Sequence, residues 1–250
     1  MMDQTLKDNW ILVSDLDDTL LGDDEALNRF RRFYERNQPQ LEVVYASGRF
    51  CDSIDEDLSK TELPEPLVTI GGVGSEIWIY PTRQPLRAWS EKISEHWSAE
   101  KVRDALSGES DLKMQGEEDQ SSYKVSYYLE GASRERLREL EYKLKNADIR
   151  FNTIYSSQRD LDILPAGVNK GKAAAFLIDY LKRPHGRVIT SGNSGNDVTL
   201  FENDFAGIIV ANADDALKKH QDKRNVYLAK ASHADGVVEG IEYWTERGSL

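Results

Sequence analysis

Strand-like and helix-like segments alternate through the first third of the chain, and this order constrains the fold more than any other feature. Apolar runs of strand length recur, and apolar residues at helical spacing separate them. The expected strands are at 10–14, 41–46 and 67–70, and the expected helices are at 25–36 and around Ile54 and Leu58. Strands that alternate with helices predict an α/β fold with a doubly wound parallel sheet. The same alternation returns after residue 165, beginning with a helix at 171–182.

Between these stretches, from about residue 84, the pattern changes. Helical spacing is expected at 98–108 and 134–147, and strand-like runs are expected at 123–129, 149–155 and 161–164. Helices and adjacent strands without regular crossovers indicate a small α+β unit. We interpret this unit as a cap at residues 84–162, inserted into a core formed by residues 1–83 and 163–250.

Three acidic side chains, Asp15, Asp17 and Asp18, directly follow the first expected strand. Like charges repel at such a place unless a cation or a chemical role accounts for them. The carboxylate of Asp15 can accept a phosphoryl group as an acyl phosphate, and Asp17, two residues on, can serve as general acid and then base. Thr19 can brace the turn. Two acids beside a phosphate dianion need a hard cation, typically Mg²⁺.

Polar groups follow other expected strands and begin a helix. The hydroxyl of Ser47 and the amides after it can hold phosphoryl oxygens, and Lys170 offers a positive charge. Asn196 and Asp197 follow a later strand and can hold a metal. Each motif alone also fits a turn, a helix cap or a solvated lysine. Because the carboxyl ends of parallel strands share one edge, the motifs together predict one crevice.

The composition excludes several partners. The chain has 44 Asp and Glu against 32 Lys and Arg, a formal net charge of −12, which argues against nucleic acid and anionic membranes. The single cysteine, Cys51, cannot form an internal disulfide, and no secretory leader is recognisable. No run approaches the ~20 apolar residues of a membrane helix. We therefore expect a cytoplasmic protein.

Four segments, in order, resemble the motifs of the haloacid dehalogenase phosphatase superfamily. They are DLDDT at 15–19, YASGR at 45–49, NKGKA at 169–173 and GNSGND at 192–197. Within that superfamily, the segments GGVGSEIW, SEHW, YKVSYYL and RDLDILP resemble the sucrose-6-phosphate phosphatases, and the similarity covers nearly the whole chain. The resemblance implies a Rossmann-like core of haloacid dehalogenase type with an inserted α+β cap. It also implies Mg²⁺-dependent hydrolysis of a disaccharide phosphate, sucrose 6-phosphate first, through an aspartyl phosphate.

The same resemblance implies roles for individual residues. Asp15 is the nucleophile, Asp17 is the general acid/base, and Ser47 with Lys170 binds the phosphoryl group. The implied substrate-binding residues are Gly48, Arg49, Gly74, Ser75, Glu76, His96, Lys124 and Asn196, and the implied metal ligands are Asp15, Asp17, Asn193 and Asp197. Further sugar contacts are expected from Gln158, Arg159 and Asp160, with Trp89 and Trp97 stacking on a sugar face.

One position departs from the superfamily pattern, which has Asp where this chain has Asn193. The change removes a negative charge from the metal side of the site. An amide oxygen can still ligate Mg²⁺, so we expect weaker metal binding.

Other functions remain open at this stage. Mannosylfructose phosphate is an alternative substrate, because only the ring bound by the cap differs. A phosphomutase shares the aspartyl-phosphate chemistry. A non-catalytic sugar-phosphate-binding protein is an alternative from another class, and Asn193 is the only feature of the sequence that favours it. The preceding sugar-phosphate synthase is a candidate partner.

Overall fold

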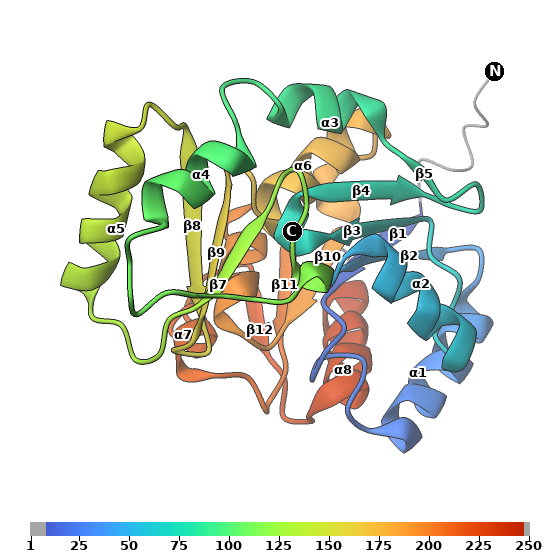
Figure 1. Cartoon of the computed structure of the whole chain (residues 1–250). Helices are drawn as coiled ribbons and strands as arrows, with labels where there is room; N and C mark the ends of the chain where they lie inside the picture. Colours follow the sequence, from blue (N-terminus) through green and yellow to red (C-terminus); the bar gives the residue numbers. More distant parts are fainter. Residues whose placement is uncertain (1–8, 248–250) are drawn as a thin grey trace.

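The computed structural model describes residues 9–247, and its centre is an eight-stranded sheet (Figure 1). The strand order is β12-β11-β10-β1-β2-β3-β4-β5. The first six strands are parallel to one another, and β4 pairs antiparallel with both β3 and β5. The bounds are β1 Trp10–Ser14, β2 Leu41–Ala46, β3 Val68–Gly71, β4 Glu76–Ile79, β5 Gln84–Pro85, β10 Val188–Gly192, β11 Ala206–Ile209 and β12 Val226–Leu228. From β1 the chain order runs outward in both directions, so the sheet reverses its winding between β1 and β10. Ligands of such sheets bind beyond the carboxyl ends at this reversal.

Helices cover both faces of the sheet, which explains why β1 is a continuous apolar run. Ile11 and Val13 pack into the cluster on one face, and Leu12 packs into the cluster on the other. Helices α3 (Arg87–Ile93) and α6 (Lys170–Tyr180) cover the first face; α1 (Asp24–Asn37) and α8 (His233–Glu246) cover the second. The remaining core helices are α2 (Cys51–Lys60) and α7 (Asp215–Lys218). Figure 1 shows these two layers around the sheet.

A second, antiparallel sheet of order β6-β7-β9-β8 lies beside the core (Figure 1). Its strands are β6 Lys113–Met114, β7 Val125–Tyr128, β8 Phe151–Ser156 and β9 Asp160–Pro165, and its helices are α4 Ala99–Leu106 and α5 Arg134–Asn146. Alternate residues of β7 and β9, such as Val125 and Ile163, pack with Leu140 and Leu144 of α5 in an apolar cluster. On the opposite face, Ser126 and Asp162 are cross-strand partners, and Leu164 and Ile154 pack with the first core cluster.

Strand pairing and packing bear on the limits of the cap, for which residues 84 and 162 are the expectation from the sequence. Strand β5 pairs with β4 in the main sheet, and Trp89 and Ile93 of α3 belong to a core cluster. Strand β9 continues its pairing with β8 to Pro165. We propose limits of 98 and 165 for the cap and use the word in that sense below. The predicted fold class, a doubly wound core with an α+β insertion, is confirmed.

Candidate active site

The four motif loops meet beyond the carboxyl ends of β1, β2 and β10, beside the first turn of α6. Asp15 directly follows β1, and its amide donates to the Ser191 carbonyl of β10 at 3.0 Å. Ser47 directly follows β2, and its amide donates to Ile70 O of β3 at 2.9 Å. Asp197 lies in the short helix at Gly195–Glu202 that follows β10. The sheet topology thus places these polar groups at the point where the winding reverses.

Lys170 joins two of these loops through a buried ammonium group. Its Nζ lies 2.8 Å from Asp15 Oδ1, 2.7 Å from Asp197 Oδ1 and 2.9 Å from Asn196 Oδ1. The Lys170 and Asp197 side chains have no exposed surface, and Asp15 has 6%. A charge buried to this degree requires paired partners, and here one cation serves two carboxylates.

Glycine allows this close approach. A Cβ atom at Gly171 would lie 1.9 Å from the Thr199 carbonyl oxygen, so a larger residue would push α6 away from the helix that carries Asp197. The Gly171 amide also donates to Thr199 Oγ1 at 3.0 Å. The glycine in the NKGKA motif therefore sets the distance at which Lys170 reaches Asp197.

The charges around Asp15 change its proton affinity. Burial raises the pKa of Asp15 first, and the neighbouring Asp197 raises it further, against the lowering effect of Lys170; the result is about 7. For Lys170, burial alone would lower the pKa, but Asp15 and Asp197 outweigh burial and raise it. Lys170 therefore stays cationic, while the metal-free site binds a proton near neutral pH.

Asp15 and Asn193 each have a side-chain oxygen within hydrogen-bond distance of the Thr19 hydroxyl group. Thr19 Oγ1 is 2.9 Å from Asp15 Oδ2 and 3.3 Å from Asn193 Oδ1. Carboxylate and amide oxygens are the hard donors that Mg²⁺ requires, so these residues fit a divalent ion. Within residues 9–247 no three His, Cys, Asp or Glu side chains form a metal-binding group.

Asp197 is engaged differently. Its Oδ1 accepts from Lys170, and its Oδ2 accepts from the amides of Asn193 and Ser194, each at 3.0 Å. Asp197 therefore holds the loop that presents Asn193 and has both carboxylate oxygens occupied.

Asp17, in contrast to Asp15, is exposed and paired with Arg49. Arg49 Nε donates to Asp17 Oδ2 at 2.9 Å, and Nη2 contacts Oδ1 of the same carboxylate. Arg49 Nη1 contacts Asp57 of α2, and the Arg49 amide donates to Ser47 Oγ at 3.1 Å. The hydrogen bonds that Arg49 donates to Asp17 raise the pKa of the guanidinium.

A polar cavity of about 420 Å³ opens above these loops, between the core and the cap. Its core side is lined by Asp15, Asp17, Asp18, Gly48, Arg49, Val73, Asn193, Ser194 and Asn196. Its cap side is lined by Gln115, Asp119, Lys124, Tyr128, Ser156, Ser157, Arg159, Asp160 and Asp162. The predicted residues Gly48, Arg49, Lys124 and Asn196 are thus brought together with both acids, and Ser47 and Lys170 are buried beneath them.

Several predicted sugar contacts lie outside this cavity lining. The Gly74 carbonyl accepts from Trp89 Nε1 at 3.0 Å, and Trp89 itself is in the core. Ser75 is buried, and Glu76 Oε2 accepts from the Cys51 amide at the start of α2.

Two further predicted contacts, His96 and Trp97, lie just before the cap and away from the cavity lining. His96 and Trp97 line a separate pocket with Lys101 and Arg150. Trp97 Nε1 donates to Ser122 O at 2.7 Å. Roles of these residues in sugar binding stay predictions.

Other lining residues were missed from the sequence, among them Gln115, Asp119, Tyr128 and Asp162. Asp162 had a signal, since it stands between the apolar residues Leu161 and Ile163 of an expected strand. The position of the other three depends on how the cap lies over the core, which local pattern does not specify.

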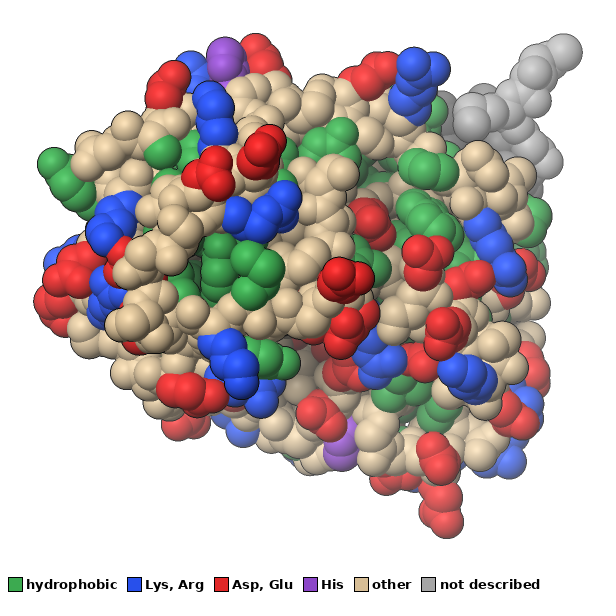
Figure 2. Space-filling model, viewed as in Figure 1, with side chains coloured by type: hydrophobic (Ala, Val, Ile, Leu, Met, Phe, Trp, Pro, Cys, Tyr) green, Lys and Arg blue, Asp and Glu red, His purple; other side chains and the backbone are tan. Residues whose placement is uncertain are grey.

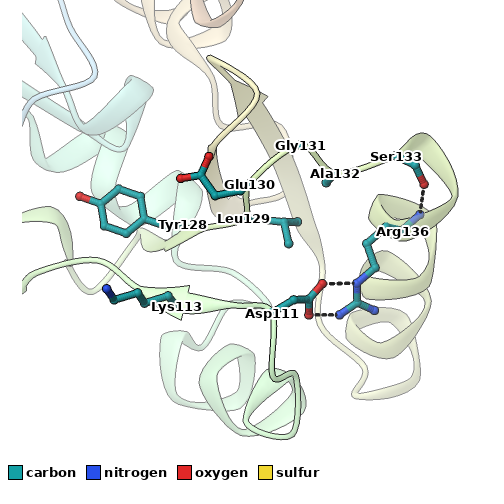
Figure 3. Close-up of a pocket in the computed structure, with 9 residues that line it drawn as sticks. All are labelled: Asp111, Lys113, Tyr128, Leu129, Glu130, Gly131, Ala132, Ser133 and Arg136. Carbon is teal, nitrogen blue, oxygen red and sulfur yellow. Dashed lines mark hydrogen bonds and ion pairs between the residues drawn. The ribbon is translucent and has the colours of Figure 1, made fainter.

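A wider pocket of about 600 Å³ lies elsewhere on the cap, at the start of α5 (Figure 3). One of its two cationic lining residues, Arg136, is bound by Asp111 and Glu109, and Figure 3 shows the Asp111 pair and the contact with Ser133. None of the four motif loops lines it. On the surface, acidic and basic side chains are interspersed over the visible face (Figure 2). No helix within residues 9–247 is long and apolar enough to cross a membrane.

The doubly wound core, the inserted cap and the buried aspartate–lysine site define the class of this chain. Its fold is that of the haloacid dehalogenase-like hydrolases, as the structure of one from Bacillus subtilis shows at 17% identity and a TM-score of 0.68. The sequence model of the sucrose-6F-phosphate phosphohydrolase family matches residues 8–245, and the chain belongs to that family.

Three relatives show how close the similarity is. A mannosylfructose-phosphate phosphatase from Agrobacterium fabrum is 36% identical over 239 residues, which cover 94% of this chain and 96% of that protein. A probable sucrose-phosphatase 2 from Arabidopsis thaliana is 33% identical over 94% of this chain, and the matched region covers 59% of the Arabidopsis protein. The X-ray structure of the sucrose-phosphatase from Synechocystis sp. PCC6803, in complex with sucrose and phosphate, has a TM-score of 0.88 at 33% identity and covers 94% of this chain and 97% of that one.

The chain is therefore a sucrose-phosphatase-like phosphoric monoester hydrolase. The family implies a phosphorylated sugar substrate and a divalent metal cofactor.

Proposed function

We propose that this chain hydrolyses a disaccharide phosphate, sucrose 6-phosphate first, to the free sugar and inorganic phosphate with Mg²⁺ as cofactor. The observation that carries the proposal is the buried Asp15–Lys170 pair, at 2.8 Å, which opens into a polar cavity lined by the cap. A phosphoryl group needs a nucleophile and cationic support at one end, and sugar hydroxyls need polar partners at the other.

The proposed reaction has two steps. A carboxylate oxygen of Asp15 forms a bond to phosphorus, the ester P–O bond breaks, and Asp17 gives its proton to the departing sugar oxygen. Water then attacks the phosphorus, Asp17 takes a proton from it, and the acyl phosphate bond breaks to release phosphate and regenerate Asp15. Asp17 must leave Arg49 to be protonated, and the phosphate dianion is a competing partner for that guanidinium.

Phosphoryl oxygens are proposed to bind the hydroxyl of Ser47, the amides of Gly48 and Arg49, and Lys170. These groups are fixed before substrate arrives, because Ser47 and Lys170 are fully buried. Donors held in place in this way stabilise the charge of the transferring group without reorganisation. Lys124 and Asn196 are proposed as further substrate contacts from the two sides of the cavity.

The metal is proposed to bind the Asp15 carboxylate, the main-chain carbonyl of Asp17 and the amide oxygen of Asn193. Asp197 is proposed to support this loop, since its two carboxylate oxygens already have partners. When bound, Mg²⁺ neutralises charge between the acids and the phosphate dianion.

The identity of the second ring is the least constrained part of the proposal. Relatives named as a mannosylfructose-phosphate phosphatase and as a sucrose-phosphatase are of similar identity to this chain. The cytoplasmic location and the preceding synthase as a partner also stay predictions, which the structure leaves untested.

A substrate panel tests the proposal. Phosphate release is measured from sucrose 6-phosphate, mannosylfructose phosphate, hexose phosphates and phenyl phosphate at one Mg²⁺ concentration. We expect the highest kcat/KM for a disaccharide phosphate. Phosphate transfer between sugar positions without release would indicate a mutase, and tight binding without turnover at saturating Mg²⁺ would indicate a binding protein.

A further inference from the structure

A buried ammonium group of the cap contacts the core directly. Lys124 comes just before β7 and is 4% exposed. Its Nζ lies 3.4 Å from the Gly48 carbonyl oxygen and 4.8 Å from the centre of the Phe50 ring. Gly48 and Phe50 belong to the loop between β2 and α2, which holds Ser47 and Arg49. The cap thus contacts the predicted phosphate-binding loop through one cation.

Two residues on neighbouring strands of the cap hold the Lys124 ammonium group on its cap side. Asp162 of β9 lies directly opposite Ser126 of β7, and Ser126 Oγ donates to Asp162 Oδ1 at 2.6 Å. The same Oδ1 lies 3.5 Å from Lys124 Nζ. Cross-strand partners share a face of the sheet, and the next pair along, Val125 and Ile163, packs into the apolar cluster of the cap. Asp162 and Ser126, called the anchor below, are therefore carried by paired strands whose opposite face is packed in the apolar cluster.

We infer that Asp162 is a positioning residue that holds the Lys124 ammonium against the Gly48 loop and thereby fixes the cap on the core. Breaking one partner of a buried pair leaves the other charge without compensation. Without the Asp162 charge, Lys124 Nζ would keep a carbonyl oxygen and an aromatic face as contacts, and Glu76 and Asp119 would remain as more distant charges. Its consequence for catalysis rests on the proposed function, because it requires that the cap side of the cavity bind the sugar of the ester.

A double-mutant cycle tests whether Asp162 acts through Lys124. The proteins are wild type, Asp162→Asn, Lys124→Met and the double variant, with Asp104→Asn on an exposed position of α4 as the matched control. We expect kcat/KM for sucrose 6-phosphate to fall roughly tenfold in each single variant, mainly through KM, with no further loss in the double variant beyond Lys124→Met. Phenyl phosphate, which does not fill the cap side, should change much less. Losses that multiply in the double variant would overturn the inference.

Hydrogen–deuterium exchange gives a readout that does not depend on turnover. Amides at residues 47–50 should exchange faster in Asp162→Asn and Lys124→Met than in wild type and Asp104→Asn. Unchanged exchange in Asp162→Asn would overturn the inference. If wild type hydrolyses neither ester, the proposed function fails, and the exchange measurement alone then decides whether Asp162 positions Lys124.

Ser126→Ala serves if Asp162→Asn does not fold. It keeps both charges and removes only the 2.6 Å hydrogen bond, so we expect a smaller loss of the same selectivity between the two esters. An unchanged selectivity together with unchanged exchange at 47–50 would contradict the role of the anchor.

Discussion

Lys170 and Asp15 form an ion pair with a 2.8 Å separation between Nζ and Oδ1, and the lysine has no exposed surface. The same ammonium lies 2.7 Å from Asp197. This single cation therefore links the loop after β1 to the loop after β10, and it compensates two carboxylates that would otherwise be buried together.

Replacing Lys170 by Met should destabilise the metal-free protein. Asp15 and Asp197 would face one another without a cation, and the loss of one partner from a buried pair costs about 3–5 kcal/mol. Denaturant unfolding in EDTA measures the change. Lys172→Met, on an exposed position of the same helix, is the control and should unfold like wild type. Equal stability of both variants would show that Lys170 does not compensate these acids.

Mg²⁺ affinity should increase with pH. The pKa of Asp15 is raised by burial and by Asp197 to about 7, so below that pH the metal must displace a proton from the carboxyl group. Metal and proton compete for the same ligand, which predicts roughly tenfold tighter Mg²⁺ binding at pH 8 than at pH 6. Calorimetric titration at the two pH values measures it. An affinity independent of pH would place the metal away from Asp15.

Asn193→Asp should tighten Mg²⁺ binding and weaken the metal-free fold. The new carboxylate adds a charge next to the metal, and it adds like-charge repulsion with Asp15 and Asp197 when the metal is removed. Thermal unfolding and calorimetry across a Mg²⁺ series measure both effects, with the change in affinity expected to be a few kcal/mol at most. Superimposed titrations of the two proteins would show that position 193 is not at the metal.

Asp17→Asn should slow hydrolysis of a sugar ester on the order of 10²–10⁴-fold, the range for loss of a general acid or base. The loss in the first step should shrink for a substrate with a very good leaving group, because its oxygen departs without a proton. Burst kinetics with sucrose 6-phosphate and with 2,4-dinitrophenyl phosphate separate the two steps. An equal loss in the first step for both substrates would contradict the general-acid role.

The sequence predicted the core and the acids at its edge more fully than the sugar side of the cavity. Asp15 and Ser47 could be placed because each ends an apolar run whose period identifies a buried strand. Strand β5 has only two residues, Gln84 and Pro85, and no periodic signal, so the sequence pattern does not predict its pairing with β4.

Glu76 illustrates a second limit. Its position in a motif suggests a sugar contact, which stays a prediction, and in the structure its Oε2 accepts from the Cys51 amide at the start of α2. A side chain near a site can hold the neighbouring backbone as readily as it binds a ligand, and one sequence does not distinguish the two. Which cap residues line the cavity depends on how the cap lies over the core. That arrangement is a long-range property, which local sequence patterns do not specify.

Trapping the phosphorylated enzyme tests the central claim most directly. The protein is mixed with substrate labelled in its phosphoryl group and Mg²⁺, quenched in acid within one turnover, and digested for mass spectrometry. The account predicts a labile phosphoryl group on the peptide that contains Asp15, and none in Asp15→Asn, which should also lack turnover while unfolding as a native protein. Label on another residue, or ordinary turnover by Asp15→Asn, would contradict it.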